Sequence, residues 1–254
     1  MANMLTTHRK QQILSILKRH GQVVAKDVSQ TMGVSEDTIR RDLREMAEKG
    51  LLQRVHGGAL PASPAVADFA GRELITPDGK VAIGRAAAKM IQPGQVVILD
   101  GGTTARQVAR HLPVSLAATI VTHSPTIALE LVNHANIEVI LIGGRMFMHS
   151  VVAVGAAAIE AIAKVHADTY FMGVTGVHPK TGLTTGNYEE AAVKRALSHA
   201  AAETIVLASS EKLNAASPYA VVPLSEISGI ITEQSADEAL TRPYEKIGIT
   251  ITRA

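Results

Sequence analysis

Small and hydroxyl-bearing residues follow an apolar run in the middle of this chain and precede a helical pattern. The segment is Asp100-Gly101-Gly102-Thr103-Thr104, directly after residues 96–99. Glycines allow close backbone approach, threonine hydroxyls donate hydrogen bonds, and a helix N-terminus favours anions. The pattern is typical of a phosphate cradle and equally of a tight structural turn. It is neither a Walker loop nor a G-x-G-x-x-G fingerprint.

Residues of the same kind recur after other apolar runs. They are Thr122-His123-Ser124, Gly143-Gly144-Arg145 and Gly173-Val174-Thr175-Gly176, with Glu189 and Lys194 near the start of a later helix and Lys212 after a further run. If the fold brings these positions together at one edge of a sheet, they would form a polar pocket suited to a phosphorylated, hydroxyl-rich metabolite. The ten histidines show no metal-ligand spacing and there is no cysteine, so we expect no metal site and no cofactor.

A parallel α/β sheet would bring these positions together. Seven short β-branched runs, most separated by helical stretches, predict βαβ units and a mostly parallel sheet, in which ligands bind beyond the carboxyl ends of the strands. The expected strands are residues 96–100, 119–122, 139–142, 169–173, 204–208, 229–232 and 248–252. The expected helices are residues 77–91, capped by Thr76, and residues 105–112, 125–132, 156–164, 189–201 and 236–244.

The first 58 residues carry a different pattern. Amphipathic stretches predict helices at residues 8–19, 25–32 and 35–49, with Gly33 ending the second and Ser35 capping the third. Two helices joined by a tight glycine-containing turn form a helix-turn-helix, whose second helix enters the DNA major groove. Residues 22–24 and 51–55 are expected to pair as strands, and the turn at residues 56–58 to follow them. This predicts a winged variant.

Charge favours DNA binding over a small helical bundle that contacts protein through a solvated charged face. Residues 1–58 hold ten Lys and Arg against six Asp and Glu, a net charge of +4, whereas the whole chain carries +2. The basic excess therefore lies where a polyanion would bind. The expected phosphate contacts are Lys26, Arg40, Arg44, Arg54 and the helix start at Ser35, with base contacts from Glu36, Asp37, Thr38 and Arg41 and with His56 at the turn.

Composition bounds the remaining possibilities. A length of 254 residues with 46% hydrophobic residues accommodates a DNA-binding domain at 1–58, a linker at 59–75 containing Pro61 and Pro64, and an α/β domain at 76–254. The N-terminus lacks an apolar signal core, and the longest apolar run, residues 151–159, is too short to span a bilayer. We therefore expect a cytoplasmic protein that contacts no membrane.

The chain resembles the DeoR/GlpR family of bacterial regulators of sugar metabolism. The resemblance rests on Val-Ser-x-x-Thr-Ile-Arg-Arg-Asp-Leu from Val34, on Val-His-Gly-Gly-Ala ending at Ala59, and on the strand-end residues above together with residues 189–195 and Lys212. It implies a winged helix-turn-helix joined to a domain similar to the ribose-phosphate isomerase and glucosamine-phosphate deaminase fold. It also implies that Gly101, Gly102, Thr103 and Thr104 hold a phosphate, and that Thr122, Ser124, Glu189 and Lys194 meet a sugar.

Three positions depart from the pattern of that family. His123 stands where asparagine is common, Ser209 where aspartate is common, and Phe147 where arginine is frequent. These departures bear on which ligand is bound and leave the DNA-binding half untouched.

The sequence thus favours a homodimeric or tetrameric repressor of a carbohydrate-utilisation operon that binds double-stranded operator DNA and is controlled by a phosphorylated sugar or polyol. A second hypothesis is a sugar-phosphate isomerase or deaminase with an appended DNA module, in which Asp100, Glu189, Lys194 or Lys212 would serve as acid and base. A transcriptional activator is a third, because composition does not separate an activator from a repressor. An architectural protein fits less well, since the large domain would then have no purpose.

Overall fold

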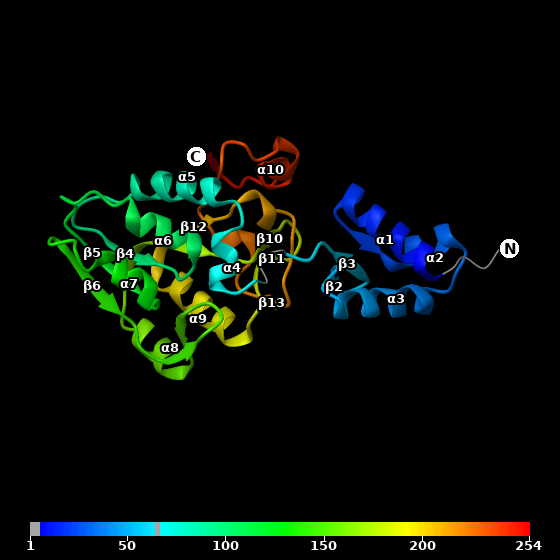
Figure 1. Cartoon of the computed structure of the whole chain (residues 1–254), viewed down its shortest axis with the longest axis horizontal. Helices are drawn as coiled ribbons and strands as arrows, with labels where there is room; N and C mark the ends of the chain where they lie inside the picture. Colours follow the sequence, from blue (N-terminus) through cyan, green and yellow to red (C-terminus); the bar gives the residue numbers. More distant parts are fainter. Residues whose placement is uncertain (1–5, 64–66) are drawn as a thin grey trace.

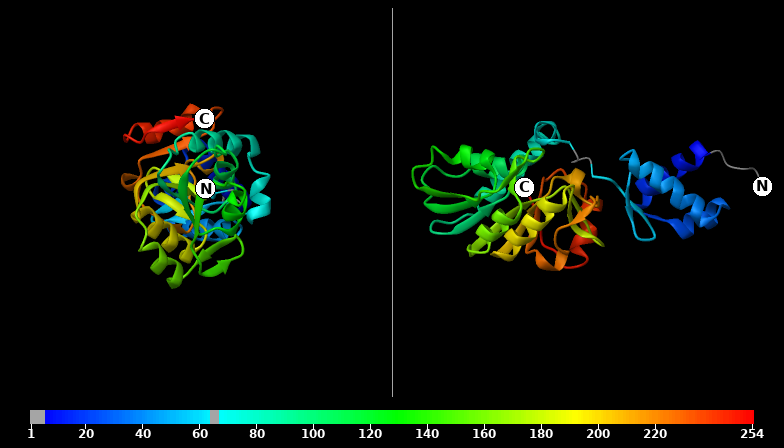
Figure 2. Two further views of the ribbon diagram at one scale, coloured as in Figure 1. Left: turned by 90° about the vertical axis from the view of Figure 1, so that its left-hand side faces the viewer. Right: turned by 90° about the horizontal axis from the view of Figure 1, so that it is seen from below.

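The computed structural model describes residues 6–63 and 67–254 and shows two lobes joined by a short connection (Figure 1). The view from below in Figure 2 shows the same separation, with the N-terminal lobe at one end of the molecule. The other positions, which include Pro64 of the expected linker and the first five residues of the N-terminus, lie outside the described residues.

Three helices form the body of the N-terminal lobe, at the predicted places: α1 (Thr6–His20), α2 (Ala25–Met32) and α3 (Glu36–Glu48). Gly33 ends α2 in the left-handed conformation, at a φ of 64°. Ser35 caps α3, because its Oγ accepts a hydrogen bond of 3.2 Å from the backbone N–H of Thr38. Ile13 and Ile39 are fully buried between the helices. The apolar stripes therefore pack the three helices against one another.

The wing differs from the prediction. Its strands are β1 (Val23–Val24), β2 (Gln53–Val55) and β3 (Gly58–Leu60), in the order β1-β3-β2. The predicted pairing of β1 with β2 is wrong, because the turn at His56 and Gly57 folds the chain back and places β3 between them. A Cβ at Gly58 would lie 1.8 Å from the carbonyl oxygen of Val23, so this pairing requires glycine. Strand β3 also extends two residues past the predicted boundary at residue 58.

A seven-stranded sheet forms the centre of the described C-terminal lobe, and every strand pair in it is parallel. This confirms the predicted α/β class. In spatial order the strands are β15 (Ile251–Arg253), β14 (Gly229–Thr232), β12 (Ala201–Leu207), β9 (Ala167–Gly173), β4 (Val96–Leu99), β5 (Ala118–Thr122) and β6 (Ile137–Leu141). Each corresponds to one of the seven predicted runs.

Two apolar cores lie on the two faces of this sheet. One lies beneath α5 (Pro77–Ala88), α6 (Thr103–Arg110) and α7 (Pro125–Leu131), and the other beneath α8 (Ala156–Ile162), α9 (Tyr188–His199) and α10 (Glu238–Glu245). Val97 and Leu99 of β4 belong to the first core and Ile98 to the second, as the two-residue period of a strand requires. The strand order reverses between β4 and β9, which makes their carboxyl ends a topological switch point.

Several short elements were not predicted. They are α4 (Phe69–Glu73), the hairpin of β7 (Arg145–Phe147) and β8 (Val152–Val154), and a small antiparallel sheet of β10 (Gly176–His178), β11 (Gly182–Thr185) and β13 (Tyr219–Ala220). Elements of two to five residues are too short to display a hydrophobic period. Thr76 also differs from its predicted capping role: it has a φ of 47°, and its hydroxyl donates to Glu211 at 3.1 Å instead of capping α5.

A buried ion pair between Arg9 of α1 and Asp42 of α3 fastens α3, the second helix of the helix-turn-helix, to the rest of the lobe. We predict that Asp42→Ala lowers the free energy of unfolding of the N-terminal lobe by about 3–5 kcal/mol, because it removes the buried carboxylate that pairs with the guanidinium of Arg9. Urea denaturation of the full chain measures this. Glu45→Ala, which removes the exposed pair with Lys10, is the matched control, with an expected loss below about 1 kcal/mol. Equal losses in the two variants would contradict the assignment.

Candidate ligand pocket and nucleic-acid interface

A pocket opens at the switch point between the carboxyl ends of β4 and β9. Its walls come from the β4–α6 turn, the residues after β9, the first turns of α9, the end of β11, the 3₁₀ turn at Ser210–Lys212, and two segments outside the sheet. The lining residues are Arg72, Gly101, Gly102, Thr103, Thr104, Ala105, Ser150, Gly173, Val174, Thr175, Thr185, Glu190, Lys194 and Lys212. The structure thus brings together eight of the predicted ligand residues.

Behind these lining residues lies the carboxylate of Asp100, which has no exposure to solvent. Its Oδ2 accepts hydrogen bonds from Lys194 and, at 2.7 Å, from the backbone N–H of Gly173. Its Oδ1 accepts one from the backbone N–H of Gly101 and lies 2.9 Å from Nε2 of His123. Burial alone would raise the pKa of Asp100, but the neighbouring Lys194 and His123 hold it well below its usual range. Asp100 is therefore an ionised structural group beneath the pocket.

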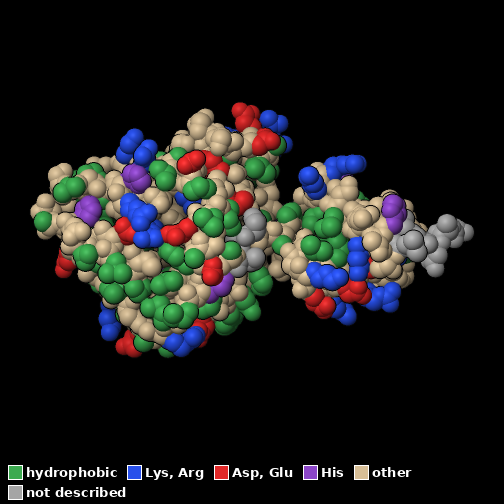
Figure 3. All heavy atoms as spheres, in the orientation of Figure 1, with side chains coloured by type: hydrophobic (Ala, Val, Ile, Leu, Met, Phe, Trp, Pro, Cys, Tyr) green, Lys and Arg blue, Asp and Glu red, His purple; other side chains and the backbone are tan. Residues whose placement is uncertain are grey.

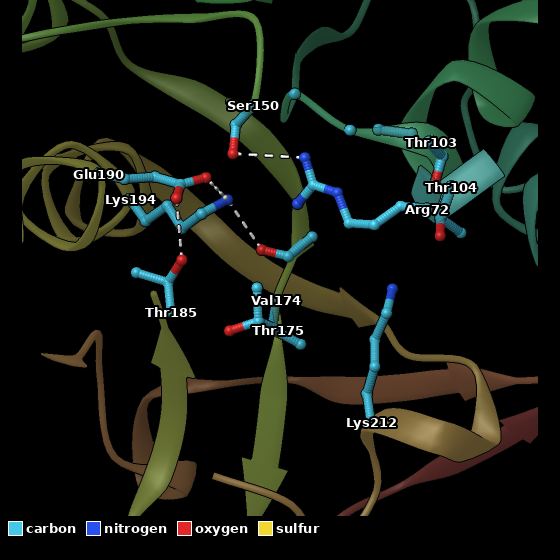
Figure 4. A pocket seen from close by; sticks show the side chains of 14 residues that line it. Arg72, Thr103, Thr104, Ser150, Val174, Thr175, Thr185, Glu190, Lys194 and Lys212 are labelled. Atoms are coloured by element: carbon cyan, nitrogen blue, oxygen red, sulfur yellow. Dashed lines mark hydrogen bonds and ion pairs between the residues drawn. The ribbon is translucent and has the colours of Figure 1, made fainter. Parts of the chain in front are cut away.

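The start of α6 forms one wall. Gly102 adopts a φ of 115°, which lets the chain turn from β4 into the helix, and Thr103 is the first helical residue. The hydroxyl of Thr104 is buried and makes no hydrogen bond within the described residues. Free backbone N–H groups at a helix start, together with such a hydroxyl, offer donors to an anion. Figure 4 shows both threonine side chains beside Arg72.

Two further cations face this helix start. Lys212 is 6% exposed and forms no salt bridge in the described part of the chain. Burial lowers its pKa to about 8, partly offset by the charge of Glu211. Arg72 donates to the hydroxyl of Ser150 at 3.3 Å, while its Nε is buried without a hydrogen-bond partner in residues 6–63 and 67–254. The side of the pocket next to the start of α6 therefore carries two cations, Arg72 and Lys212 (Figure 4).

Glu190 supplies an acceptor at the far side. It is 5% exposed and receives a hydrogen bond of 2.9 Å from the hydroxyl of Thr185, with Nζ of Lys194 at 3.7 Å. The predicted residue was Glu189, which instead forms an ion pair with Arg145 on the outside. Neighbouring residues of a helix point in different directions, whereas residues four apart share a face. The spacing to Lys194 would have identified Glu190 in the sequence.

Several predicted ligand residues do not line this pocket. Thr122, His123 and Ser124 are fully buried behind it, where His123 contacts the carbonyl oxygen of Ala153 as well as Asp100. Gly143, Gly144 and Arg145 lie exposed at the turn from β6 into β7, and Gly176 lies in β10. Of the departures from the family pattern, Phe147 stacks on His149 and Ser209 donates to Glu211 at 2.6 Å. His123, the third departure, supports the buried carboxylate of Asp100 and does not line the pocket.

Conversely, the structure adds residues that the sequence interpretation missed: Arg72, Ala105, Ser150, Val174, Thr185 and Glu190. Arg72 and Ser150 lie in segments that show no periodicity and sit outside the main sheet. No local signal in the sequence assigns these two to the pocket.

The predicted basic DNA contacts lie on the surface of the N-terminal lobe. Lys26, Arg40, Arg41, Arg44, Arg54 and His56 are all exposed. Arg40 of α3, Arg54 of β2 and the turn residue His56 line one groove between the recognition helix and the wing. Glu36 pairs with Arg40 at 2.7 Å and orients it along the helix. Figure 3 shows basic and acidic side chains side by side over this part of the lobe.

No described helix has the length and apolarity needed to cross a membrane. Within the described ranges, no three histidine, cysteine, aspartate or glutamate side chains are close enough together to hold a metal ion.

Comparison with known proteins identifies both lobes. Residues 9–64 match the DeoR-like helix-turn-helix domain, and residues 75–234 match the DeoR C terminal sensor domain. The chain belongs to the DeoR family.

This chain is 34% identical over 250 residues to the HTH-type transcriptional regulator GlpR of Haloferax volcanii, covering 98% of each chain. It is 32% identical to the HTH-type transcriptional repressor GlcR of Bacillus subtilis, covering 94% of this chain and 93% of that one. Ribose 5-phosphate isomerase A of Methanocaldococcus jannaschii aligns with 54% of each chain, at 19% identity and a TM-score of 0.40.

This DeoR family regulator should contact DNA phosphates through the wing as well as the recognition helix. We predict that Arg54→Ala weakens binding about equally for all DNA sequences and reduces the slope of log affinity against log salt by about 1. Fluorescence anisotropy over a salt series measures both. Arg110→Ala, which removes an exposed arginine paired with Glu130 in the other lobe, should change neither quantity. A salt slope that is unaltered in Arg54→Ala would exclude this phosphate contact.

Proposed function

We propose that this protein represses transcription of a carbohydrate-utilisation operon and that a phosphorylated sugar or polyol, bound in the pocket at the switch point, controls its binding to operator DNA. The observation that carries the proposal is the buried cation Lys212, which has no salt bridge among the described residues and faces the start of α6, in a chain whose other lobe is a helix-turn-helix. A phosphate dianion would supply the missing counter-charge.

The two sides of the pocket suit the two parts of such an effector. Thr103, Thr104 and Lys212 offer hydroxyl, backbone and ammonium donors to a phosphate. Glu190 and Thr185 lie across the pocket, where a carboxylate and a hydroxyl can hold sugar hydroxyl groups (Figure 4). Phosphate binding would provide affinity, and the hydroxyl contacts would provide selectivity.

Repression is supported by relatives. GlcR of Bacillus subtilis is named a transcriptional repressor. A protein of Escherichia coli O157:H7 that is 29% identical over 253 residues is named a putative aga operon transcriptional repressor. A repressor that reads two half-sites requires a closed oligomer, so we expect a homodimer or tetramer acting in the cytoplasm. We assign DNA binding to the chain up to Leu60, where β3 ends, and effector binding to residues 76–254 together with Arg72 of the connection.

The catalytic alternative lacks support from the geometry. Asp100 is fully buried and ionised beside Lys194, and Glu189 pairs with Arg145 outside the pocket. Three of the four expected acid and base groups are therefore engaged in structural ion pairs. This arrangement suits a pocket that binds its ligand without transforming it.

The double variant Thr103→Ala, Thr104→Ala tests the effector site. We predict that it binds the DNA upstream of its own gene with unchanged affinity but no longer releases it when a sugar phosphate is added. Electrophoretic mobility shifts measure both. The effector for the assay comes from thermal-shift screening of sugar and polyol phosphates, where a ligand at 100 times its dissociation constant stabilises the fold by about 2.7 kcal/mol. Thr119→Ala, outside the pocket on β5, should respond normally. A normal response of the double variant would place the phosphate elsewhere.

Effector affinity should also depend on pH through Lys212. Because burial lowers the pKa of this ammonium to about 8, the cation is present below that pH and lost above it. Affinity for a phosphate dianion should therefore fall about tenfold between pH 7 and pH 9. Isothermal titration calorimetry measures it. Lys212→Arg keeps its charge throughout this range and should abolish the dependence, so an identical pH profile in that variant would refute the role of Lys212.

A further inference from the structure

Arg72 differs from the other pocket residues in where it comes from. It lies on α4, in the connection between the lobes, well outside the sheet that supplies most of the pocket. Its side chain nevertheless extends across the pocket from beside Thr104 toward Ser150 (Figure 4). The connection therefore forms part of the pocket wall.

The guanidinium of Arg72 is poorly satisfied for a half-buried cation. Its Nη2 donates to Ser150 Oγ at 3.3 Å and to the carbonyl oxygen of His149 at 3.5 Å, both long and both to neutral acceptors. Its Nε is buried and has no hydrogen-bond partner among the described residues. Removal from water lowers its pKa, against the attraction of Glu190 and Asp100. A guanidinium offers a planar fork of donors that matches phosphate or carboxylate oxygens, so the group that completes this site is an anion.

The α4 helix is held largely by polar contacts. The backbone N–H of Phe69 donates to the carbonyl oxygen of His149 at 3.0 Å, Lys80 donates to the carbonyl oxygen of Arg72, and Glu73 pairs with Arg106 of α6. No residue of α4 is fully buried. A helix without buried apolar side chains has little to hold it in one position, so a new contact at Arg72 can shift or fix it.

The other end of the connection also reaches the pocket. The hydroxyl of Ser63 donates to the carbonyl oxygen of Thr175, a pocket-lining residue. The backbone of Ala216 bonds both Pro61 and Ser63. Ser63 lies three residues beyond the end of β3 in the wing. The chain between the wing and α5 thus touches the pocket twice.

We propose that Arg72 binds the anionic group of the effector, so that the segment connecting the two lobes is itself a ligand-binding element. This inference rests on the proposed effector function and names the part of the chain that senses occupancy. A phosphate monoester bound between Thr104 and Arg72 pairs the guanidinium and fixes α4. Because α4 belongs to the segment between the two lobes, occupancy of the pocket acts directly on that segment.

Three variants separate this role from simple folding: Arg72→Gln, Arg72→Lys and the control Arg110→Gln, which removes an exposed arginine of α6 that pairs with Glu130 and not with α4. The probes are inorganic phosphate and the sugar phosphate that most stabilises the wild-type chain in thermal-shift screening. Isothermal titration calorimetry should show at least about tenfold weaker binding in Arg72→Gln, partial recovery in Arg72→Lys because the charge returns without the planar fork of donors, and wild-type affinity in Arg110→Gln.

Hydrogen exchange supplies a readout that a structural role would not alter. Saturating sugar phosphate should slow amide exchange in residues 67–75 of the wild-type chain, and should leave it unchanged in Arg72→Gln even at saturation. Equal affinity and equal protection in wild type and Arg72→Gln would overturn this inference while the proposed function stands. A wild-type chain that binds no sugar phosphate would overturn both.

Discussion

The carboxylate of Asp100 is the constraint on which the C-terminal lobe depends. It receives donors from Lys194 on α9, from the backbone at the end of β9, and from the turn that follows β4, and it contacts His123 after β5. An ionised carboxylate without access to water is stable only when opposite charge and hydrogen bonds surround it. The ends of three strands and one helix are therefore held at fixed positions around one buried charge.

This constraint shapes the electrostatics of the pocket above it. Lys194 is neutralised by Asp100, so its charge stabilises the fold, whereas Lys212 and Arg72 face the same space without a carboxylate paired to them among the described residues. The pocket is therefore lined both by a cation that is already neutralised, Lys194, and by two that are not paired with a carboxylate among the described residues. The unsatisfied ones come from separate parts of the chain, and one of them comes from the connection between the lobes. Coupling between two sites requires about 1–3 kcal/mol of differential binding, which one ionic contact shielded from water can supply.

Much of the fold could be predicted from the sequence, because each element carries its own local pattern. All seven strands of the main sheet and the helices α1 to α3 match the predicted runs within a few residues. The cap at Ser35 and the left-handed Gly33 follow from side-chain and backbone chemistry that involves only neighbours. Eight pocket residues were found because parallel strands present their carboxyl ends at one edge. The signal that located them is topological and needs no knowledge of side-chain packing.

By itself, then, the sequence determined the two modules, the parallel sheet and the edge at which a ligand would bind, since these depend on periodicity and on residues adjacent in the chain. Only the tertiary structure decided which side chains reach the pocket. It placed Glu190 inside and Glu189 outside, buried His123 against Asp100, inserted β3 between β1 and β2, and brought Arg72 across the pocket. These outcomes depend on contacts between segments far apart in sequence, where burial and charge pairing, not local pattern, select one arrangement.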